Sequence, residues 1–490
     1  MNLAAETDRP VILWFRHDLR LADQAALSAA IASGRPILAL YVLDDVSPGT
    51  WRAGGASRWW LHHSLLRLGT RLARHGLTLV LRRGDARAVL TSVVRETGAV
   101  AIHAGGGVEP WLRALDRDLS AILDIPLHRH RTTTLFNPAR ILTASGTPYG
   151  VYTPFARACF AAMPAPPLPA PEGRLRGAVP IVSDRLGDWA LLPQRPNWSA
   201  GWERQWHPGE DGAAAAMARF LAEGLGEYAA RRDLPGGAFT SRLSPHLHFG
   251  EISAATLWHA AGAAADEAGQ GLLTFRREVL WREFSHYLLY HHQSLPEAPL
   301  IARFSAMPWR QDAAGLAAWQ RGRTGVPIVD AGMRELWTTG WMHNRVRMIV
   351  ASFLVKHLLL PWQEGEGWFW DTLLDADLAA NAASWQWVAG SGADAAPYFR
   401  VFNPVLQGRK FDADGAYVRR FVPELAGLPD AYLHAPWEAP AAILASAGVR
   451  LGVTYPAPIV DLAEGRARAL AAFAAIRGEA GEHALQEADA

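Results

Sequence analysis

Residues Thr339–Leu359 read TGWMHNRVRMIVASFLVKHLL, and this stretch decides how the second half of the chain folds. Its apolar residues recur at helical spacing, which predicts a helix over Asn344–Leu359. One face of that helix carries Asn344, Arg347 and Met348. Arginines and an amide at the opening turns of an otherwise apolar helix indicate a buried polar contact, because an unpaired buried charge is very unfavourable.

Downstream, the sequence LLDADLAANAASWQWVAGSGADAAPYF supplies possible partners. Asp375 and Asp377 stand at an expected helix start, where acids cap free backbone N–H groups. Capping alone can account for either aspartate. It does not explain Asn381, which follows Asp377 by four residues and precedes Trp385 and Trp387 in a very apolar stretch.

Upstream, EVLWREF (Glu278–Phe284) places Glu278, Trp281 and Arg282 on one helical face. An acid, a flat ring and a cation together suit a pocket that stacks a base and binds a phosphate. Core packing of Trp281 beside a solvated ion pair explains the same pattern. The turn TSRLS (Thr240–Ser244) can present hydroxyl and N–H groups to a diphosphate, although such turns are common.

Helical spacing continues over most of the chain beyond Gly226. The clearest expected helices are Leu272–His291, Gly315–Arg321, Ile328–Thr338, Asn344–Leu359 and Trp368–Trp387. The first 135 residues instead alternate short apolar runs with helical stretches, which indicates a Rossmann-like α/β domain with a parallel sheet. The expected strands are Val11–Phe15, Ile37–Val42, Leu77–Leu81, Val100–His103 and Ile125–Arg129. The expected helices between them are Gln24–Ala32, Ser57–Arg74, Ala86–Thr97 and Trp111–Leu123.

The sequence therefore predicts four parts. A Rossmann-like parallel-sheet domain covers residues 1–135, and its GGG run lacks the G-x-G-x-x-G spacing of classical NAD-binding proteins. Residues 136–225 form a long connector that includes the proline-dense PAPPLPAPEG. An all-helical domain spans residues 226–476, and residues 477–490 form an Ala/Glu-rich tail with a frayed end.

Composition narrows the classes of function. The chain has 490 residues and no apolar run that could span a membrane, and its N-terminus does not resemble a secretory signal. Cys159 is the only cysteine, so we expect no internal disulfide, a packing role for its thiol and a cytoplasmic location. The histidine pairs lack thiolates and an H-E-x-x-H motif, so no metal is expected. A net charge of +1 argues neither for nor against nucleic acid, and the 21 tryptophans indicate either packing or stacking and electron relays.

These motifs resemble the photolyase/cryptochrome family over nearly the whole chain. The resemblance runs from LWFRHDLRLADQAAL (Leu13–Leu27) to FDADGAYVRRFVPEL (Phe411–Leu425). The stretch from TGWMHNRVRMI through DAAPYFRVFNPVLQGRKF is similar to the class I cyclobutane-dimer photolyases in order and spacing. The resemblance implies an α/β antenna domain, a connector and a helical domain that binds FAD in a folded conformation. It also implies a monomeric deoxyribodipyrimidine photo-lyase, a carbon–carbon lyase that acts on dimer-containing DNA by electron transfer from excited, reduced FAD.

The residues that match the family's FAD-binding positions are Tyr228, Thr240, Ser241, Arg242, Leu243, Ser244, Asn344, Arg347, Asp375, Asp377 and Asn381. By this resemblance Tyr228 and the Thr240–Ser244 turn would contact the phosphates. Arg347 and Asp375 would form an ion pair beside the isoalloxazine ring. Asp377 would bind along the ring edge, and Asn381 would face flavin N5. An amide can hydrogen-bond N5 without supplying a ready proton, which suits an anionic, fully reduced flavin.

The resemblance also implies a lesion pocket. The catalytic positions are Glu278, Trp281, Met348, Asn381 and Trp387. Trp281 and Trp387 would form its aromatic walls, Glu278 would hydrogen-bond the flipped-out pyrimidines, and Met348 matches the cyclobutane-dimer branch. The histidine pair of (6-4) photolyases does not occur in Asn344–Met348. The positions that match DNA contacts are Arg232, Glu278, Trp281, Arg282, Asn344, Arg345 and Gln407.

Trp309, Trp362 and Trp385 match the tryptophan chain that carries electrons from the surface to oxidised FAD, although spacing alone leaves simple packing open. The sequence also leaves undecided which antenna chromophore, if any, the protein binds. Glu109 stands where folate-binding members have an acid, but Val108 replaces the expected amide, and SLPEAP lacks a basic residue. A 5,10-methenyltetrahydrofolate, a deazaflavin or no antenna all agree with the sequence.

Two other functions remain open. The first is a cryptochrome-like blue-light photoreceptor without repair turnover. Sensors of the family often carry long C-terminal extensions, whereas this chain ends soon after Gly478, which favours repair. The second is a flavoprotein or nucleotide-binding protein of Rossmann type that works in the dark.

Overall fold

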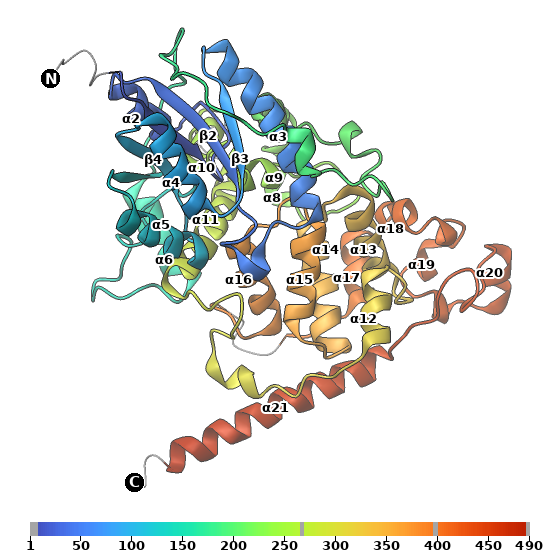
Figure 1. The fold of residues 1–490 in the computed structure, drawn as a ribbon. Helices are drawn as coiled ribbons and strands as arrows, with labels where there is room; N and C mark the ends of the chain where they lie inside the picture. The colour runs from blue at the N-terminus through green and yellow to red at the C-terminus, as the bar shows by residue number, and fades with distance from the viewer. Residues whose placement is uncertain (1–7, 265–268, 395–399, 487–490) are drawn as a thin grey trace. The chain divides into compact units, whose positions relative to one another are not determined.

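The computed structural model describes residues 8–264, 269–394 and 400–486 (Figure 1). The chain divides into two compact units. Unit 1 comprises Met1–Ala229, Thr240–Gln293 and Leu374–Ala379. Unit 2 comprises Ala230–Phe239, Ser294–Leu373 and Ala380–Ala490. The boundaries predicted at residues 135, 225 and 476 stay predictions.

Unit 1 contains a sheet of five strands in the order β3-β2-β1-β4-β5, all parallel. The strands are β1 (Val11–Phe15), β2 (Ile37–Leu43), β3 (Leu79–Arg83), β4 (Ala101–Gly106) and β5 (Leu127–Arg131). All five predicted strands and the parallel sheet are confirmed, with β3 and β5 shifted toward the C-terminus. The central strands are buried, as expected of a parallel sheet that is covered on both faces.

Four helices cover this sheet: α2 (Ala25–Ala32), α3 (Gly55–Arg74), α4 (Ala86–Thr97) and α5 (Pro110–Ile122). The face that carries Ile12, Leu40 and Ile102 packs against α4 and α5 in one apolar core. Right-handed crossovers place α2 and α3 on the opposite face, because β1, β2 and β3 follow one another in one direction across the sheet. The predicted α/β architecture of the first part of the chain is therefore confirmed.

The remaining elements of unit 1 are helical. They are η1 (Gly49–Trp51), α6 (Tyr152–Ala162), η2 (Leu186–Trp189), η3 (Trp202–Arg204), α7 (Glu210–Arg219), the π-helical turn η4 (Phe220–Gly224), α8 (Tyr228–Arg231), α9 (Ser244–His248), α10 (Ala254–Ala264) and α11 (Gln270–His291). The last two residues of α8 belong to unit 2. The expected connector thus contains α6 and α7, which the sequence analysis missed. Cys159 is buried on α6 and burial raises the pKa of its thiol, as its expected packing role requires.

Unit 2 is built from helices. They are η5 (Ala302–Ala306), α12 (Ala313–Gln320), α13 (Pro327–Thr339), α14 (Asn344–Ser352), the π-helical turn η6 (Phe353–His357), α15 (Trp362–Thr372), α16 (Leu378–Ala389), α17 (Pro404–Phe411), α18 (Ala416–Phe421), η7 (Pro423–Leu425), α19 (Asp430–Leu433), η8 (Pro436–Glu438), α20 (Ala441–Ser446) and α21 (Leu462–Gln486). The first two residues of α16 belong to unit 1. Helix α21 continues through the predicted tail as far as Gln486, and residues 487–490 lie outside the described part of the chain.

Two helix predictions need correction. The single helix expected over Trp368–Trp387 is wrong, because α15 ends at Thr372 and α16 begins at Leu378. The N–H of Asp377 donates to the carbonyl of Asp375 in the turn between them (2.7 Å). The two aspartates therefore stand before a helix start, as their positions indicated. The helix expected over Asn344–Leu359 changes at Phe353 from α-helix to a π-helical turn.

Candidate functional site

In unit 1, helix α11 presents the predicted Glu278, Trp281 and Arg282, and all three side chains are half-buried. The Trp281 ring stacks on Tyr152 of α6, with centroids 3.7 Å apart and planes only 6° apart. The Tyr152 hydroxyl donates to the carbonyl of Arg277 (2.7 Å). One face of Trp281 is therefore held against a fixed ring, which sets the orientation of the indole.

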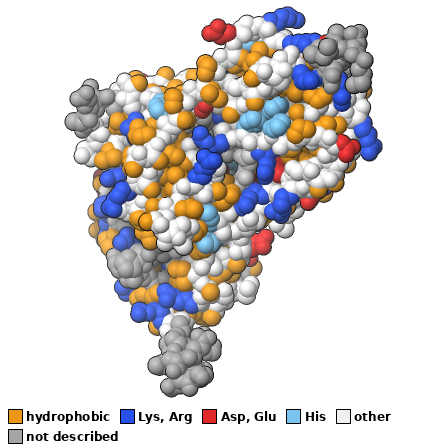
Figure 2. All heavy atoms as spheres, turned by 90° about the vertical axis from the view of Figure 1, so that its left-hand side faces the viewer, with side chains coloured by type: hydrophobic (Ala, Val, Ile, Leu, Met, Phe, Trp, Pro, Cys, Tyr) orange, Lys and Arg blue, Asp and Glu red, His pale blue; other side chains and the backbone are white. Residues whose placement is uncertain are grey.

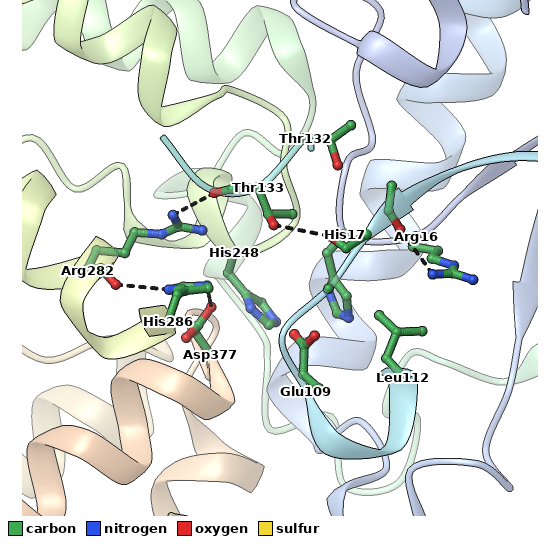
Figure 3. A pocket seen from close by; sticks show the side chains of 13 residues that line it. Arg16, His17, Glu109, Leu112, Thr132, Thr133, His248, Arg282, His286 and Asp377 are labelled. Atoms are coloured by element: carbon green, nitrogen blue, oxygen red, sulfur yellow. Dashed lines mark hydrogen bonds and ion pairs between the residues drawn. The ribbon is translucent and has the colours of Figure 1, made fainter. Parts of the chain in front are cut away.

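A small polar cavity of about 10 Å³ also lies in unit 1 (Figure 3). Figure 3 shows His248 between Asp377 and His286 on one side and His17 on the other. The lining residues are Arg16, His17, Gly105, Gly106, Gly107, Glu109, Leu112, Thr132, Thr133, His248, Arg282, His286 and Asp377. The volume is about that of one water molecule. The cavity brings together three predicted residues: Glu109, Arg282 and Asp377.

An ion pair in this cavity joins Asp377 to His286, whose Nε2 lies 3.2 Å from a carboxylate oxygen. Burial by itself would raise the pKa of Asp377, but His286, with help from Arg282 and His248, holds that pKa far below its ordinary value. The pKa of His286 is raised because Asp377 outweighs the effect of burial. Burial lowers the pKa of His248 to about 3, so this imidazole is neutral at pH 7.

Arg282 and Glu109 differ in whether their charged groups have hydrogen-bond partners. The Nη1 of Arg282 donates to the carbonyl of Thr133 (2.9 Å), so the predicted DNA-binding arginine lines the cavity. Glu109 buries Oε2 without a hydrogen-bond partner among the described residues. The folate antenna expected at Glu109 stays a prediction.

Tyr228, at the start of α8, and the Thr240–Ser244 turn, which leads into α9, are further predicted cofactor residues of unit 1. Tyr228 is buried, and its ring packs edge-on against Phe220 and Phe275. The turn residues Thr240, Ser241, Arg242 and Ser244 are partly exposed, and Leu243 is buried. Arg242 has a φ of 53°, an unusual backbone for a non-glycine residue, and its guanidinium lies 4.6 Å from the Trp206 ring centroid.

Unit 2 contains a larger cavity of about 510 Å³. It brings together three residues that the sequence analysis predicted: Arg345, Met348 and Gln407. The other lining residues are Ala230, Asp233, Leu234, Arg400, Phe402, Lys410 and Phe411. The lining therefore combines three cations, one acid and several apolar side chains.

Arg345 is fixed within this cavity by two contacts. Its Nη2 lies 2.6 Å from Asp233, and its guanidinium lies 4.5 Å from the Phe411 ring centroid. The predicted Arg232 precedes Asp233 in the same unit, and the predicted Asn344 is exposed at the start of α14. The arginine is thus held in one place before any ligand arrives, which lowers the entropy lost on binding.

Asn381, Trp387 and Arg347 also belong to unit 2. Asn381 is buried, and its Nδ2 donates to the carbonyl of Glu366 (3.0 Å), which leaves Oδ1 as the available acceptor. Trp387 is half-buried, and its Nε1 donates to the carbonyl of Asp394 (3.2 Å). The Nε of Arg347 donates to the carbonyl of Met342 (2.8 Å). Asp375 belongs to unit 1, so its predicted ion pair with Arg347 stays a prediction.

The three tryptophans of the predicted electron chain lie in unit 2 with graded burial. Trp309 is half-exposed and packs against the apolar cluster of η5 and α21. Trp362 and Trp385 are each only 2% exposed. Trp385 packs edge-on against Phe369 of α15, with centroids 5.1 Å apart. A gradient from a solvent-accessible ring to buried rings is the arrangement that an electron relay needs.

Sequence reasoning missed several of these residues. His286 and His248 had no recognisable spacing relative to Asp377, and Asp233 stood far from Arg345 along the chain. Lys410 could have been found, because it follows Gln407 by three residues and shares its face on α17. For the two histidines and Asp233, the missing signal was a contact between distant segments.

Charge on the surface is uneven although the net charge is only +1. On the face drawn in Figure 2, Lys and Arg side chains appear at several points and Asp and Glu at few. The described residues hold no group of three or more His, Cys, Asp or Glu arranged to bind a metal ion. Within the same ranges, no helix is both long and apolar enough to cross a membrane.

Two family models match the chain. The model described as DNA photolyase matches residues 11–172, and the model described as FAD binding domain of DNA photolyase matches residues 275–475. A deoxyribodipyrimidine photo-lyase from Agrobacterium fabrum is 49% identical over 473 residues, covering 96% of this chain and 98% of that protein. Cryptochrome-1 from Arabidopsis thaliana is 39% identical, covering 93% of this chain and 69% of that protein.

A solved structure agrees with these matches. The crystal structure of a bacterial class III photolyase from Agrobacterium tumefaciens superposes with a TM-score of 0.92 at 49% identity, covering 96% of this chain and 98% of that chain. The expected resemblance to class I enzymes is not supported, because this similar structure is a class III photolyase. The motifs that suggested class I therefore do not separate the classes. The chain belongs to the photolyase/cryptochrome family.

Proposed function

We propose that this protein is a light-driven DNA repair enzyme, a deoxyribodipyrimidine photo-lyase that splits cyclobutane pyrimidine dimers. The observation that carries the proposal is the cavity of unit 2. Its lining joins Met348 to the cations Arg345, Arg400 and Lys410. A hollow that combines cations with apolar side chains suits two linked, flipped-out pyrimidines whose flanking phosphates are negatively charged.

FAD is the proposed cofactor, and the residues that would hold it fit this group. Asp377 is kept ionised in a buried position and can accept a hydrogen bond from a ring N–H. Asn381 has its amide N–H engaged by Glu366, so its oxygen can face N5. The hydroxyls of Thr240, Ser241 and Ser244 would bind the phosphates. When bound and reduced, FAD supplies a photoexcited electron that splits the dimer and is then regained.

The chain's own residues would bind the lesion and hold it in place. Trp281 and Trp387 stack on the two pyrimidines, and Trp281 needs no reorientation because Tyr152 already holds its ring. Glu278 hydrogen-bonds the flipped bases and stabilises charge that develops on them. Extrusion of a dimer costs only about a few kcal/mol, because the lesion is already poorly stacked.

A second candidate is a blue-light photoreceptor without repair turnover. It is favoured by the 39% identity to a plant cryptochrome over most of this chain. The cations that line the unit 2 cavity favour repair, since a light sensor needs no affinity for DNA. The similar structure makes class III the proposed class within the repair branch.

The test is repair of a dimer-containing oligonucleotide under blue light by protein with bound, reduced FAD. We expect intact thymines to be restored only in the light. Glu278→Ala should lower the repair yield while FAD stays bound, and Glu364→Ala, an exposed change on α15, should repair like the parent. A parent protein that carries reduced FAD and restores no thymine would reject the proposal. Light-dependent partner binding without lesion affinity would favour the photoreceptor.

A further inference from the structure

Glu366 is a buried acid that the proposed repair chemistry does not use. Its side chain is 1% exposed, and neither carboxyl oxygen has a hydrogen-bond partner among the described residues. A carboxylate buried in this way is very unfavourable, whereas the neutral acid loses much less hydration. The geometry alone therefore favours a carboxyl group that carries its proton.

Electrostatic effects on Glu366 also favour the protonated carboxyl group. Burial raises the pKa of Glu366 well above its ordinary value, and the negative charge of Glu297 raises it further. The adjoining element η6 contributes Lys356, whose Nζ donates to the carbonyl of Ala389 (2.9 Å) and whose pKa is lowered by burial. His357 of η6 has a pKa lowered to about 4 by burial and Arg468, so it is neutral. The charged group that acts on the pKa of Glu366 is thus an acid, Glu297, which favours the protonated carboxyl group.

Glu366 lies between the proposed electron chain and the proposed flavin contact, and all these residues belong to unit 2. Trp362 precedes it by one helical turn and shares its buried face on α15. Trp385 packs directly over the neighbouring Gly365. Asn381 donates to the backbone carbonyl of Glu366 itself.

We propose that Glu366 holds a proton in the folded protein and donates it inside the site when an electron arrives through Trp309, Trp362 and Trp385. The inference rests on the proposed function, because it takes Asn381 as the residue beside flavin N5. Asn381 can direct a hydrogen bond but has no acidic proton to give. Glu366 is the adjacent acid that can supply one.

The step balances in charge and atoms. Trp385 loses one electron to the oxidised flavin, and the O–H bond of Glu366 breaks as its proton follows to the flavin. Glu366 is left as a carboxylate and regains a proton from water. The oxidised tryptophan chain regains its electron at Trp309 from an external one-electron donor such as a thiol. The proton moves the added negative charge from the flavin to Glu366, and reprotonation of Glu366 from water then removes that charge from a poorly solvated site.

The first measurement is the infrared difference spectrum between illuminated and dark protein that contains oxidised FAD. The parent should lose the C=O stretching band of a protonated carboxyl group on photoreduction. Glu366→Gln, which keeps the shape and neutrality of the side chain, should lack that change. Glu364→Gln, an exposed substitution on the same helix, should keep it. A parent without the band change, or a Glu366→Gln variant that retains it, would overturn the proposal.

The second measurement separates this inference from the proposed function. In Glu366→Gln, the protonated one-electron product should form at least about tenfold more slowly, as removal of a general acid predicts. Repair by the chemically reduced variant should match the parent, because the electron that repairs the dimer needs no proton from Glu366. If the parent shows the carboxyl band change but repairs no dimer, the proposed repair function is rejected. The assignment of Glu366 as a proton donor then still stands. If Glu366→Gln fails to bind FAD, Glu366→Asp gives the same test: its carboxyl band should appear at a shifted frequency, and a band identical to the parent's would overturn the proposal.

Discussion

Asp377 and Glu366 show how burial alone does not fix the charge of a carboxyl group. Both are acids with little exposure, yet the pKa of Asp377 is lowered and that of Glu366 is raised. The difference lies in their partners. Asp377 meets His286 at 3.2 Å, whereas Glu366 has no partner among the described residues and faces the charge of Glu297. At the scale of the residue, the neighbour decides whether a buried acid keeps its charge.

Asp377→Asn should lower the pKa of His286 below about 6.5, because burial remains while the counter-charge is lost. The parent's pair stabilises the fold fully between about pH 3.9 and pH 6.5. That stability is lost as the pH falls through the lowered pKa of Asp377, or as it rises through the raised pKa of His286. NMR titration of the imidazole checks the shift. An unchanged His286 titration in the variant would contradict the assigned pairing.

Glu366→Gln should make the protein more stable than the parent at neutral pH and equally stable near pH 4. Glu366 has a raised pKa, so the folded state binds a proton that the unfolded state releases above about pH 4.3. The parent's free energy of unfolding should therefore fall with pH by up to about 1.4 kcal/mol per pH unit relative to the variant. Denaturant unfolding at several pH values measures this difference. A difference independent of pH would show that Glu366 does not titrate on unfolding.

At the scale of the element, α15 and α16 illustrate how a helix pair is held in register. Trp385 of α16 packs over Gly365 of α15, where an added Cβ would lie 2.0 Å from the indole. A glycine is therefore required for this close approach, and it sets how deeply the indole sits beside Phe369. The same contact positions the last tryptophan of the proposed relay.

Gly365→Ala should lower the free energy of unfolding by about 1–3 kcal/mol, because the methyl group overpacks a rigid indole. It should also slow photoreduction of FAD, since Trp385 must shift. Gly367→Ala is the matched control on the same helix, because an added Cβ there meets nothing within 4 Å. Denaturant unfolding and flash photoreduction provide the two readouts. Equal stability of the two variants would mean that α15 can move away at little cost.

For the whole molecule, binding to DNA depends on where the cations lie, because the net charge is only +1. The unit 2 cavity concentrates Arg345, Arg400 and Lys410 around apolar side chains. The lining holds three cations and one acid, Asp233, which pairs with Arg345, so the charges of the lining side chains sum to a positive value. A protein of nearly neutral charge can thus attract phosphates locally.

Lys410→Ala should weaken binding of dimer-containing DNA and reduce the slope of log affinity against log salt by about one. The loss should be similar for damaged and undamaged DNA, because a lysine–phosphate contact carries no information on the lesion. Arg74→Ala, which removes an exposed cation of α3, is the control. Fluorescence anisotropy over a range of salt concentrations measures both effects. A salt slope equal to the parent's would place Lys410 outside the DNA interface.

The sequence predicted regular elements well where the pattern was local. The strand runs near Val11 and Ile37 and the helix Ala86–Thr97 appear as expected. The prediction of one helix failed at Leu373–Asp377. The helical spacing of apolar residues continues there, although the Asp375–Asp377 turn ends one helix before the next begins. The sequence analysis also missed α6, which a proline-dense segment follows, and α7, which lies in the stretch interpreted as a connector. Periodicity is a property of neighbours along the chain, and breaks depend on particular hydrogen bonds.

The sequence by itself determined the parallel sheet, the helical second half and the identity of residues such as Met348, Asn381 and Trp385, because each rests on spacing or motif within one segment. Only the tertiary structure decided that His286 keeps Asp377 ionised, that Asp233 holds Arg345 and that Glu366 is buried without a partner. These properties depend on hydration and on charges brought close from distant parts of the chain. A pattern within one segment of the sequence shows neither the hydration of a side chain nor its distant charged neighbours.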